Sequence, residues 1–222
     1  MAIKLIAFDW NGTLLADTQV NLRASNFNFK KFGLKQISLT QFQKTFHIPV
    51  SRFWLEHKGK TEDLDAQSKN FHRLYETHAN KTRTRAGSKP LLSWLKKYGI
   101  KRMIYSNHIA PDIIKQLMRL NIFEYFDEVL ARSVEDGHTQ VHFRNKEQKL
   151  LDYIKRNNLK PKEILTVGDT EEEIEIGKKY GYHTVAITGG YNSTARLKKH
   201  KPDFLIHNMK DLIPIIKKLN CY

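Results

Sequence analysis

Ile3-Lys4-Leu5-Ile6-Ala7-Phe8 is a largely apolar run that continues directly into Asp9-Trp10-Asn11-Gly12-Thr13. A short apolar run that ends in polar residues and glycine is typical of a buried strand. Further apolar runs predict strands over 100–105, 127–131, 164–167, 184–187 and 204–206. Between and after them, three-to-four spacing predicts helices over 89–98, 111–120, 146–157, 171–180 and 212–219. This alternation predicts an α/β fold, a Rossmann-like parallel sheet with helices on both faces.

The segment between the first strand and Gly87 follows another pattern. From Val20 to about Ala79 aromatic and leucine residues recur at helical spacing, and breaks are expected near Gly33, Pro49 and Gly59. We therefore predict an inserted α-helical domain over 19–83, and a core domain made of 1–18 and 84–222.

Composition excludes several classes of protein. The chain has 222 residues, 40% of them hydrophobic, and one cysteine, Cys221, so an internal disulfide is impossible. No apolar run approaches the roughly 18 residues that span a bilayer, and the opening run is too short for a signal-peptide core. We expect a globular cytoplasmic protein with no membrane association. The net charge of +15 is compatible with nucleic acid, but no nucleic-acid-binding module is recognisable.

Three predicted strands end in reactive polar residues. Asp9 follows the first, Ser106-Asn107 follows the second, and Gly168-Asp169 follows a later one. A single acidic residue after a strand is usually a turn former. In an open parallel sheet, however, ligands bind at the carboxyl ends of the strands, where these residues would meet. The coincidence predicts a functional site at that edge.

Four motifs in order resemble those of the haloacid dehalogenase-like (HAD) hydrolase superfamily. They are Asp9-x-Asn11-Gly12-Thr13-Leu14, Ser106 at a strand end, Lys146, and Gly168-Asp169. Gly189-Gly190-Tyr191 and Lys201-Pro202-Asp203 also resemble phosphoglycolate-phosphatase-like members. The resemblance covers nearly the whole chain and implies that the inserted helices form a small cap.

The resemblance assigns roles that are chemically consistent. Asp9 would be the nucleophile that forms an aspartyl-phosphate, and Lys146 would neutralise developing charge. Gly12, Thr13, Ser106 and Asn107 would bind the phosphoryl group. Mg²⁺ is the implied cofactor, because carboxylates and phosphate oxygens suit a hard cation. Its implied ligands are the side chains of Asp9, Asp169 and Glu173 and the main-chain carbonyl of Asn11.

The chain departs from the family pattern at two positions and leaves a third open. Asn11 stands where family phosphatases usually have an acid/base Asp, and an amide cannot transfer that proton. Asn11→Asp is therefore expected to raise turnover if proton transfer limits the rate. Glu173 replaces an Asp, and first-turn helix capping explains it equally well, whereas Glu171 and Glu172 are expected to be solvated.

The third position is the family lysine. Lys146 has the expected spacing from Asp169, and its competitors are Arg144, Lys149 and Lys155. His138 and His142 are spaced like zinc ligands, but spacing places no third ligand, and loop histidines are the simpler interpretation.

The leading hypothesis is a Mg²⁺-dependent phosphomonoester hydrolase acting on a small phosphorylated metabolite. The alternative is a non-catalytic or degenerate member that binds a phosphorylated or anionic partner, favoured by Asn11 and the basic charge. A 2-haloacid dehalogenase would fit Ser106-Asn107 but not the metal site implied by Gly168-Asp169.

Overall fold

The computed structural model describes residues 2–133 and 146–221 of the chain. Its core is a six-stranded parallel sheet in the order β3-β2-β1-β4-β5-β6. The strands are β1 (Leu5–Phe8), β2 (Lys101–Ile109), β3 (Glu128–Arg132), β4 (Ile164–Gly168), β5 (His183–Ile187) and β6 (Phe204–Ile206). The predicted α/β class, with a parallel sheet, is confirmed.

Helices cover both faces of the sheet. They are α5 (Ser88–Lys97), α6 (Ala110–Arg119), α7 (Lys146–Arg156), α8 (Glu171–Tyr180), α9 (Thr194–Lys199) and α10 (Leu212–Asn220). Successive residues of a strand point to opposite faces. Accordingly, Ile6 and Phe8 of β1 pack with α5, α6 and α10, whereas Leu5 and Ala7 pack with α7 and α8.

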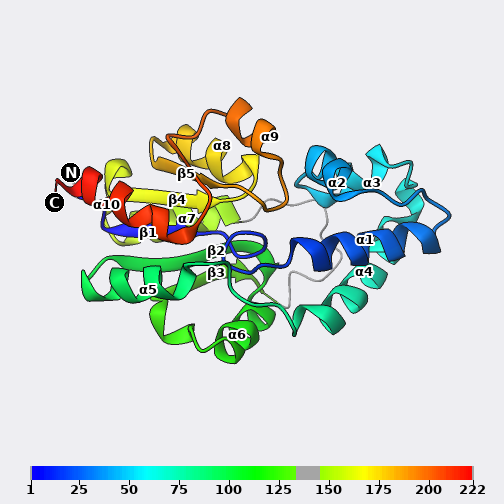
Figure 1. The fold of residues 1–222 in the computed structure, drawn as a ribbon, viewed down its shortest axis with the longest axis horizontal. Helices are drawn as coiled ribbons and strands as arrows, with labels where there is room; N and C mark the ends of the chain where they lie inside the picture. The colour runs from blue at the N-terminus through cyan, green and yellow to red at the C-terminus, as the bar shows by residue number, and fades with distance from the viewer. Residues whose placement is uncertain (1, 134–145, 222) are drawn as a thin grey trace.

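A second group of helices lies beyond the carboxyl ends of the strands (Figure 1). These are α1 (Thr18–Lys31), α2 (Leu39–Thr45), α3 (Val50–Glu56) and α4 (Leu64–Ala79), which we call the cap. The cap has an aromatic core of its own that includes Phe29, Phe42, Phe53 and Trp54. The predicted domain boundaries, 18/19 and 83/84, remain a prediction.

Two chain segments connect the cap to the sheet and run side by side. The Ala16 amide donates to the Arg83 carbonyl at 2.9 Å, and the Arg85 amide donates to the Leu14 carbonyl at 2.8 Å. The connection is therefore a paired strip of main chain that fixes where the cap leaves the core.

Two features differ from the sequence-based expectations. Strand β2 extends to Ile109, because it resumes pairing with Arg132 of β3 after an irregularity that follows Tyr105, so Ser106 lies within the strand. Helix α9 was not predicted.

Among the described residues no helix is long and apolar enough to cross a membrane. His138, His142 and Arg144 lie outside the described residues.

Candidate active site

Asp9 lies at the carboxyl end of β1, and its amide donates to the Val167 carbonyl of β4 at 2.9 Å. Its carboxylate faces Lys146, the first residue of α7, whose Nζ is 3.2 Å from Asp9 Oδ1. The Lys146 ammonium also lies 5.0 Å from the centre of the Tyr105 ring. Of the lysine candidates, Lys149 instead donates to the Ala131 carbonyl, so Lys146 is the one beside Asp9.

Two glutamates complete the surroundings of Lys146. Its Nζ is 2.9 Å from Glu172 Oε2 and also pairs with Glu173 Oε1. The expectation that Glu172 is solvated is wrong, because its side chain is 1% exposed and also accepts a hydrogen bond from Asn107. Glu171 is also not free in solvent, since it pairs with Arg196 of α9. Of the acidic residues in the first turn of α8, Glu172 and Glu173 thus face Lys146 in the site, and Glu171 faces Arg196.

Glu173 has a double role in this turn. Its Oε2 accepts from the Thr170 hydroxyl at 2.7 Å and from the Thr170 amide at 3.2 Å, while Oε1 pairs with Lys146. Gly168 permits this approach, because a Cβ there would lie 2.0 Å from Glu173 Cγ. The helix-capping interpretation of Glu173 is confirmed; its role as a metal ligand remains a prediction.

Asp169 directly follows the last residue of β4 and is fully buried. The Thr13 hydroxyl donates to its Oδ1 at 2.5 Å, and the Tyr191 amide donates to its Oδ2 at 2.6 Å. A Cβ at Gly12 or at Gly190 would lie 2.2 Å from Oδ2. These two glycines therefore form a cradle for the carboxylate, and Gly12 in addition has a φ of +74° that favours glycine.

The site concentrates negative charge in a buried place. Burial raises the pKa of Asp9 well above its ordinary value, Lys146 opposes the rise, and Glu173 and Asp169 add to it. Burial likewise raises the pKa of Asp169 to about 7, with Glu173 contributing. Burial would lower the pKa of Lys146, but Asp9, Glu172 and Glu173 together hold it well above its ordinary value.

These residues fit a divalent cation. Lys146 faces Asp9, Glu172 and Glu173, and Asp169 lies close by with Arg85 as a nearby cation, so the buried carboxylates outnumber the described cations around them. Within the described ranges, no three His, Cys, Asp or Glu side chains form a ready metal centre. Mg²⁺ does not need one, because it is usually held by one or two carboxylates, waters and substrate phosphate.

Asn11 belongs to a network centred on Asp17, a residue that the motif analysis did not single out. The Asn11 amide donates to Asp17 Oδ2 and to the Tyr75 hydroxyl, each at 2.8 Å. Asp17 also accepts from the hydroxyls of Tyr75 and Tyr191, at 2.5 and 2.7 Å, and from the Gly12 amide at 2.6 Å. Burial raises the pKa of Asp17 even though these hydrogen bonds lower it.

This network joins three parts of the chain: the turn after β1, helix α4 of the cap, and the loop after β5. Burial also raises the pKa values of Tyr75 and Tyr191 well above the ordinary value, so both phenols stay protonated donors. In the sequence, Asp17 looks like an ordinary acidic residue before a helix, and for that reason the motifs did not indicate it.

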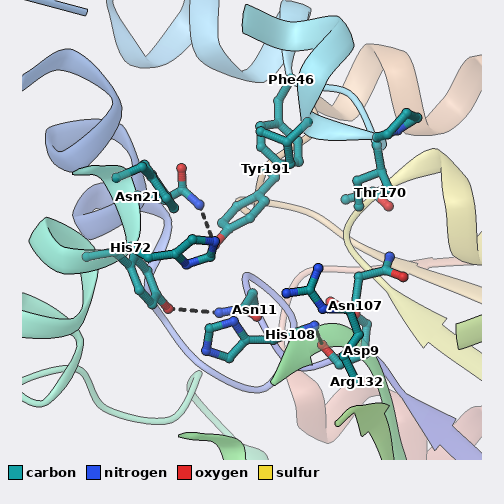
Figure 2. A pocket seen from close by; sticks show the side chains of 16 residues that line it. Asp9, Asn11, Asn21, Phe46, His72, Asn107, His108, Arg132, Thr170 and Tyr191 are labelled. Atoms are coloured by element: carbon teal, nitrogen blue, oxygen red, sulfur yellow. Dashed lines mark hydrogen bonds between the residues drawn. The ribbon is translucent and has the colours of Figure 1, made fainter. Parts of the chain in front are cut away.

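A cavity of about 140 Å³ opens above Asp9 (Figure 2). Of the predicted residues, Asn11, Ser106 and Asn107 line it together with Asp9, and they are joined by Thr170 and by further neighbours that the motifs did not indicate. Those neighbours come from the cap, from β2 and β3, and from the loop after β5: Asn21, Phe46, Ile48, Pro49, Val50, Phe71, His72, Tyr75, His108, Arg132 and Tyr191.

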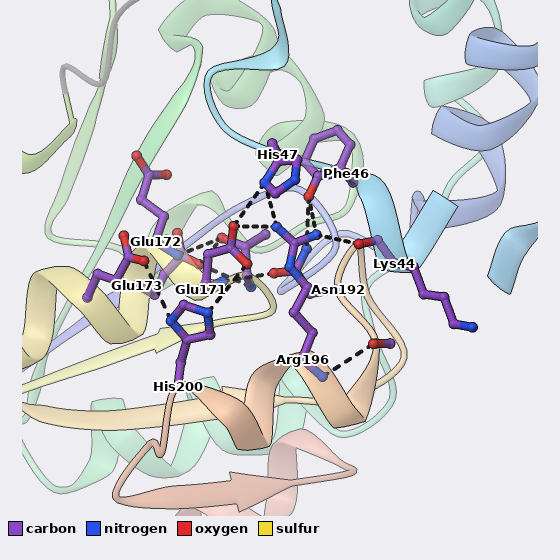
Figure 3. Close-up of polar contacts among 12 residues, drawn as sticks. Lys44, Phe46, His47, Glu171, Glu172, Glu173, Asn192, Arg196 and His200 are labelled. Atoms are coloured by element: carbon purple, nitrogen blue, oxygen red, sulfur yellow. Dashed lines mark hydrogen bonds and ion pairs between the residues drawn. The ribbon is translucent and has the colours of Figure 1, made fainter. Parts of the chain in front are cut away.

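The cap also contacts the core through Arg196 of α9 (Figure 3). Its guanidinium donates to the carbonyls of Phe46 and Lys44, at 2.5 and 3.2 Å, to His47 Nδ1 at 2.6 Å, and to Glu171. Burial and the nearby Arg196 lower the pKa of His47 while Glu171 opposes this, and because a guanidinium only donates, His47 Nδ1 is the acceptor toward Arg196. We call these contacts the Arg196 latch.

Comparisons with known proteins point to one family of hydrolases. The family model for haloacid dehalogenase-like hydrolases matches residues 6–187. Phosphoglycolate phosphatase 1 of Pseudomonas aeruginosa is 24% identical over 219 residues, covering 95% of this chain and 79% of that protein. Pyrophosphatase PpaX of Bacillus mycoides is 25% identical over 224 residues, covering 99% of this chain and all of that protein (100%).

Solved structures show the same fold. A protein described as a predicted phosphatase from Clostridium acetobutylicum superposes with a TM-score of 0.81 at 18% identity, covering 98% of this chain and 100% of that one. A haloacid dehalogenase-like family protein from Streptococcus pneumoniae gives a TM-score of 0.80 at 19% identity, covering 96% and 98%. With a family model matched over most of its length, the chain belongs to the haloacid dehalogenase-like hydrolase family.

Proposed function

We propose that this chain is a Mg²⁺-dependent phosphomonoester hydrolase that acts on a small phosphorylated metabolite through an aspartyl-phosphate. The observation that carries the proposal is the pairing of Asp9 Oδ1 with Lys146 at 3.2 Å on the floor of a cavity. The relatives named as phosphatase and pyrophosphatase act on phosphate compounds, which supports the same reaction class.

The reaction would proceed in two displacements. An Asp9 carboxylate oxygen attacks phosphorus, the bond from phosphorus to the ester oxygen breaks, and the alcohol leaves after taking up a proton. Water then attacks the phosphorus of the aspartyl-phosphate, which releases inorganic phosphate and a proton and restores the carboxylate. Lys146 holds positive charge beside Asp9 throughout, where the negative charge of the phosphoryl oxygens increases.

The remaining residues bind and orient the phosphoryl group. The Ser106 hydroxyl and the main-chain amides of the turn after Asp9 are suited to its oxygens, except the Gly12 amide, which donates to Asp17 instead. Asp9, Asp169 and the Asn11 carbonyl would hold Mg²⁺, with Glu173 as a further candidate. When bound, the cation supplies positive charge that polarises the phosphoryl oxygens.

The test is phosphate release from p-nitrophenyl phosphate in the presence of Mg²⁺. We expect Asp9→Asn to lower kcat by about 10³-fold or more, since the nucleophile is lost. Asp65→Asn, on an exposed cap residue, is the matched control and should keep the wild-type rate. Wild-type turnover by Asp9→Asn would contradict the nucleophile assignment, and full activity in excess EDTA would contradict the metal.

A second candidate, a degenerate member that binds a phosphorylated ligand without turnover, is favoured by one observation. The Asn11 amide is held by Asp17 and Tyr75 and cannot donate a proton to the leaving alcohol. Absence of phosphate release from sugar phosphates, nucleotides and phosphoglycolate, together with measurable binding of those compounds, would establish the binder instead.

A further inference from the structure

The cavity above Asp9 has a polar floor and an apolar wall that faces it. The floor carries the polar groups of Asp9, Asn11, Ser106, Asn107 and Thr170. The cap contributes mainly apolar side chains to the facing wall, which are Phe46, Ile48, Pro49, Val50 and Phe71. The phosphoryl group belongs on the polar floor, so the leaving group of a bound ester would meet the apolar wall.

The apolar wall is not fully buried by the protein itself. Ile48, Val50 and Phe71 pack only partly against the aromatic core of the cap. Phe71 is held by a stacked contact with Tyr75, with ring centres 5.8 Å apart and planes 19° apart. Apolar surface left open beside a catalytic floor gains free energy when a ligand of matching character covers it.

The cavity is also poor in cations, although the chain has 38 lysines and arginines. Among the described lining residues, Arg132 is the one Lys or Arg, and it is 6% exposed and already has an interaction partner. A second anionic group on the substrate would therefore have at most this one described guanidinium to offset the hydration that it loses. Phosphoglycolate, with its carboxylate, and pyrophosphate both carry such a group.

Two histidines at the cavity do not change this conclusion. His72 of the cap and His108 of β2 are near parallel, with ring centres 6.4 Å apart and planes 26° apart. Flat stacked rings favour a flat or apolar neighbour.

The size of the cavity limits the leaving group. Its volume of about 140 Å³ also has to hold the phosphoryl group, and because an apolar cavity of ~150 Å³ holds one benzene molecule, the enclosed part of the leaving group is no larger than one ring. We propose that the substrate is a phosphomonoester of an uncharged, apolar or aromatic alcohol of about one ring, in contrast to phosphoglycolate or pyrophosphate. This inference rests on the proposed hydrolase function and names its substrate class.

The decisive comparison uses two esters of primary alcohols, benzyl phosphate and 2-phosphoglycolate, with pyrophosphate as a third compound. The esters share a type of leaving oxygen and differ in apolar surface and charge. We expect kcat/KM for benzyl phosphate to exceed the value for phosphoglycolate by roughly 10- to 100-fold, from burial of the ring. A preference for phosphoglycolate or pyrophosphate would overturn the inference.

Variants test whether the apolar wall causes the preference. Val50→Thr keeps the shape but places a hydroxyl on the wall, and should lower kcat/KM for benzyl phosphate about three- to tenfold and lower it less for phosphoglycolate. Leu39→Thr is the matched control, because Leu39 and Val50 each begin a seven-residue cap helix and pack partly on the same core, but only Val50 lines the cavity. Equal effects of the two variants on benzyl phosphate would contradict the role of the wall.

A binding measurement separates this inference from the hydrolase proposal. Calorimetric titration of wild-type protein with benzylphosphonate and with phosphonoacetate, neither of which has a P–O–C bond to cleave, should show tighter binding of benzylphosphonate. If no ester is hydrolysed but this order holds, the hydrolase proposal fails and the apolar preference stands. If phosphonoacetate binds as tightly, the preference fails whether or not esters are hydrolysed.

Discussion

The Asn11 side chain donates to two acceptors, Asp17 Oδ2 and the Tyr75 hydroxyl, each at 2.8 Å. A carboxylate at position 11 could make neither donation and would face the buried Asp17 carboxylate. The motif pattern alone suggests that an aspartate here would restore proton transfer, but its neighbours are arranged for an amide. Asn11 therefore acts as a connector between the turn after β1 and helix α4 of the cap.

We predict that Asn11→Asp lowers the free energy of unfolding by about 1–2 kcal/mol, because two hydrogen bonds are lost and two carboxylates repel. Denaturant unfolding measures the change. Asn11→Ala, which removes the same donors without adding charge, should be less destabilised. If Asn11→Asp is as stable as wild type and turns over faster, the carboxylate is tolerated and takes up the acid/base role.

Gly190 tests the cradle around Asp169, because a Cβ there would lie 2.2 Å from Asp169 Oδ2. We predict that Mg²⁺ raises the melting temperature of wild-type protein by several degrees, since a cation that binds only the folded state stabilises it. Gly190→Ala should lose that response, as should Asp169→Asn. Gly99→Ala is the control: its φ is +66° but nothing lies within 4 Å, so it should melt earlier and keep the Mg²⁺ response.

Individual site residues were predictable where a motif marks them. Asp9 and Lys146 come together because a strand end and a helix start meet at one edge of the sheet. Glu172 and Asp17 were not predictable, because acids at the start of a helix are ordinarily solvated. Their partners, Lys146 for one and the tyrosines 75 and 191 for the other, are distant in the sequence.

At the scale of elements, the alternation of apolar runs was sufficient to predict the sheet and its main helices. Helix α9 escaped prediction because it has six residues with one buried apolar side chain, Leu197, which sets no periodicity. Strand β2 was predicted too short because Ser106-Asn107-His108 look like a turn, whereas pairing with β3 resumes at Ile109. Ser106 lies at the site because this polar stretch is part of a strand.

The short helix α9 has a clear part in the structure, since Arg196 reaches the segment between α2 and α3. Its guanidinium donates to the Phe46 and Lys44 carbonyls, which the end of α2 leaves without intrahelical partners. Phe46 lines the cavity, so the Arg196 latch fixes one wall of the site. Cap position and cavity shape are therefore coupled through a residue that touches no catalytic group.

We predict that Arg196→Ala lowers the free energy of unfolding by about 1–2 kcal/mol, from loss of charge-assisted hydrogen bonds. It should also speed amide hydrogen exchange in residues 39–56 relative to β1 and β4, measured by mass spectrometry. Lys198→Ala is the matched control, an exposed neighbour on the same helix. Equal exchange of this segment in both variants would show that the latch does not hold the cap.

At the scale of the whole molecule, the charge outside the site and the charge within it have opposite signs. The chain carries a net charge of +15, yet buried carboxylates surround Lys146 and only one described Lys or Arg lines the cavity. The basic surface therefore contributes little to holding a bound ester in place. It acts at a distance, by raising the concentration of anions near the molecule.

Because this attraction acts over a distance, its strength depends on the ionic strength of the solution. Surface charges are screened beyond ~30 Å at 0.01 M salt but beyond only ~6 Å at 0.3 M, whereas buried pairs such as Asp9–Lys146 are screened much less. Over that range we expect kcat/KM for a dianionic phosphomonoester to fall roughly 3- to 10-fold while kcat stays constant. Inhibition by benzyl alcohol, an uncharged competitor, is the control and should not weaken. A kcat/KM that is flat with salt would mean that the basic surface plays no part in substrate capture, and a falling kcat would place the salt effect within the site.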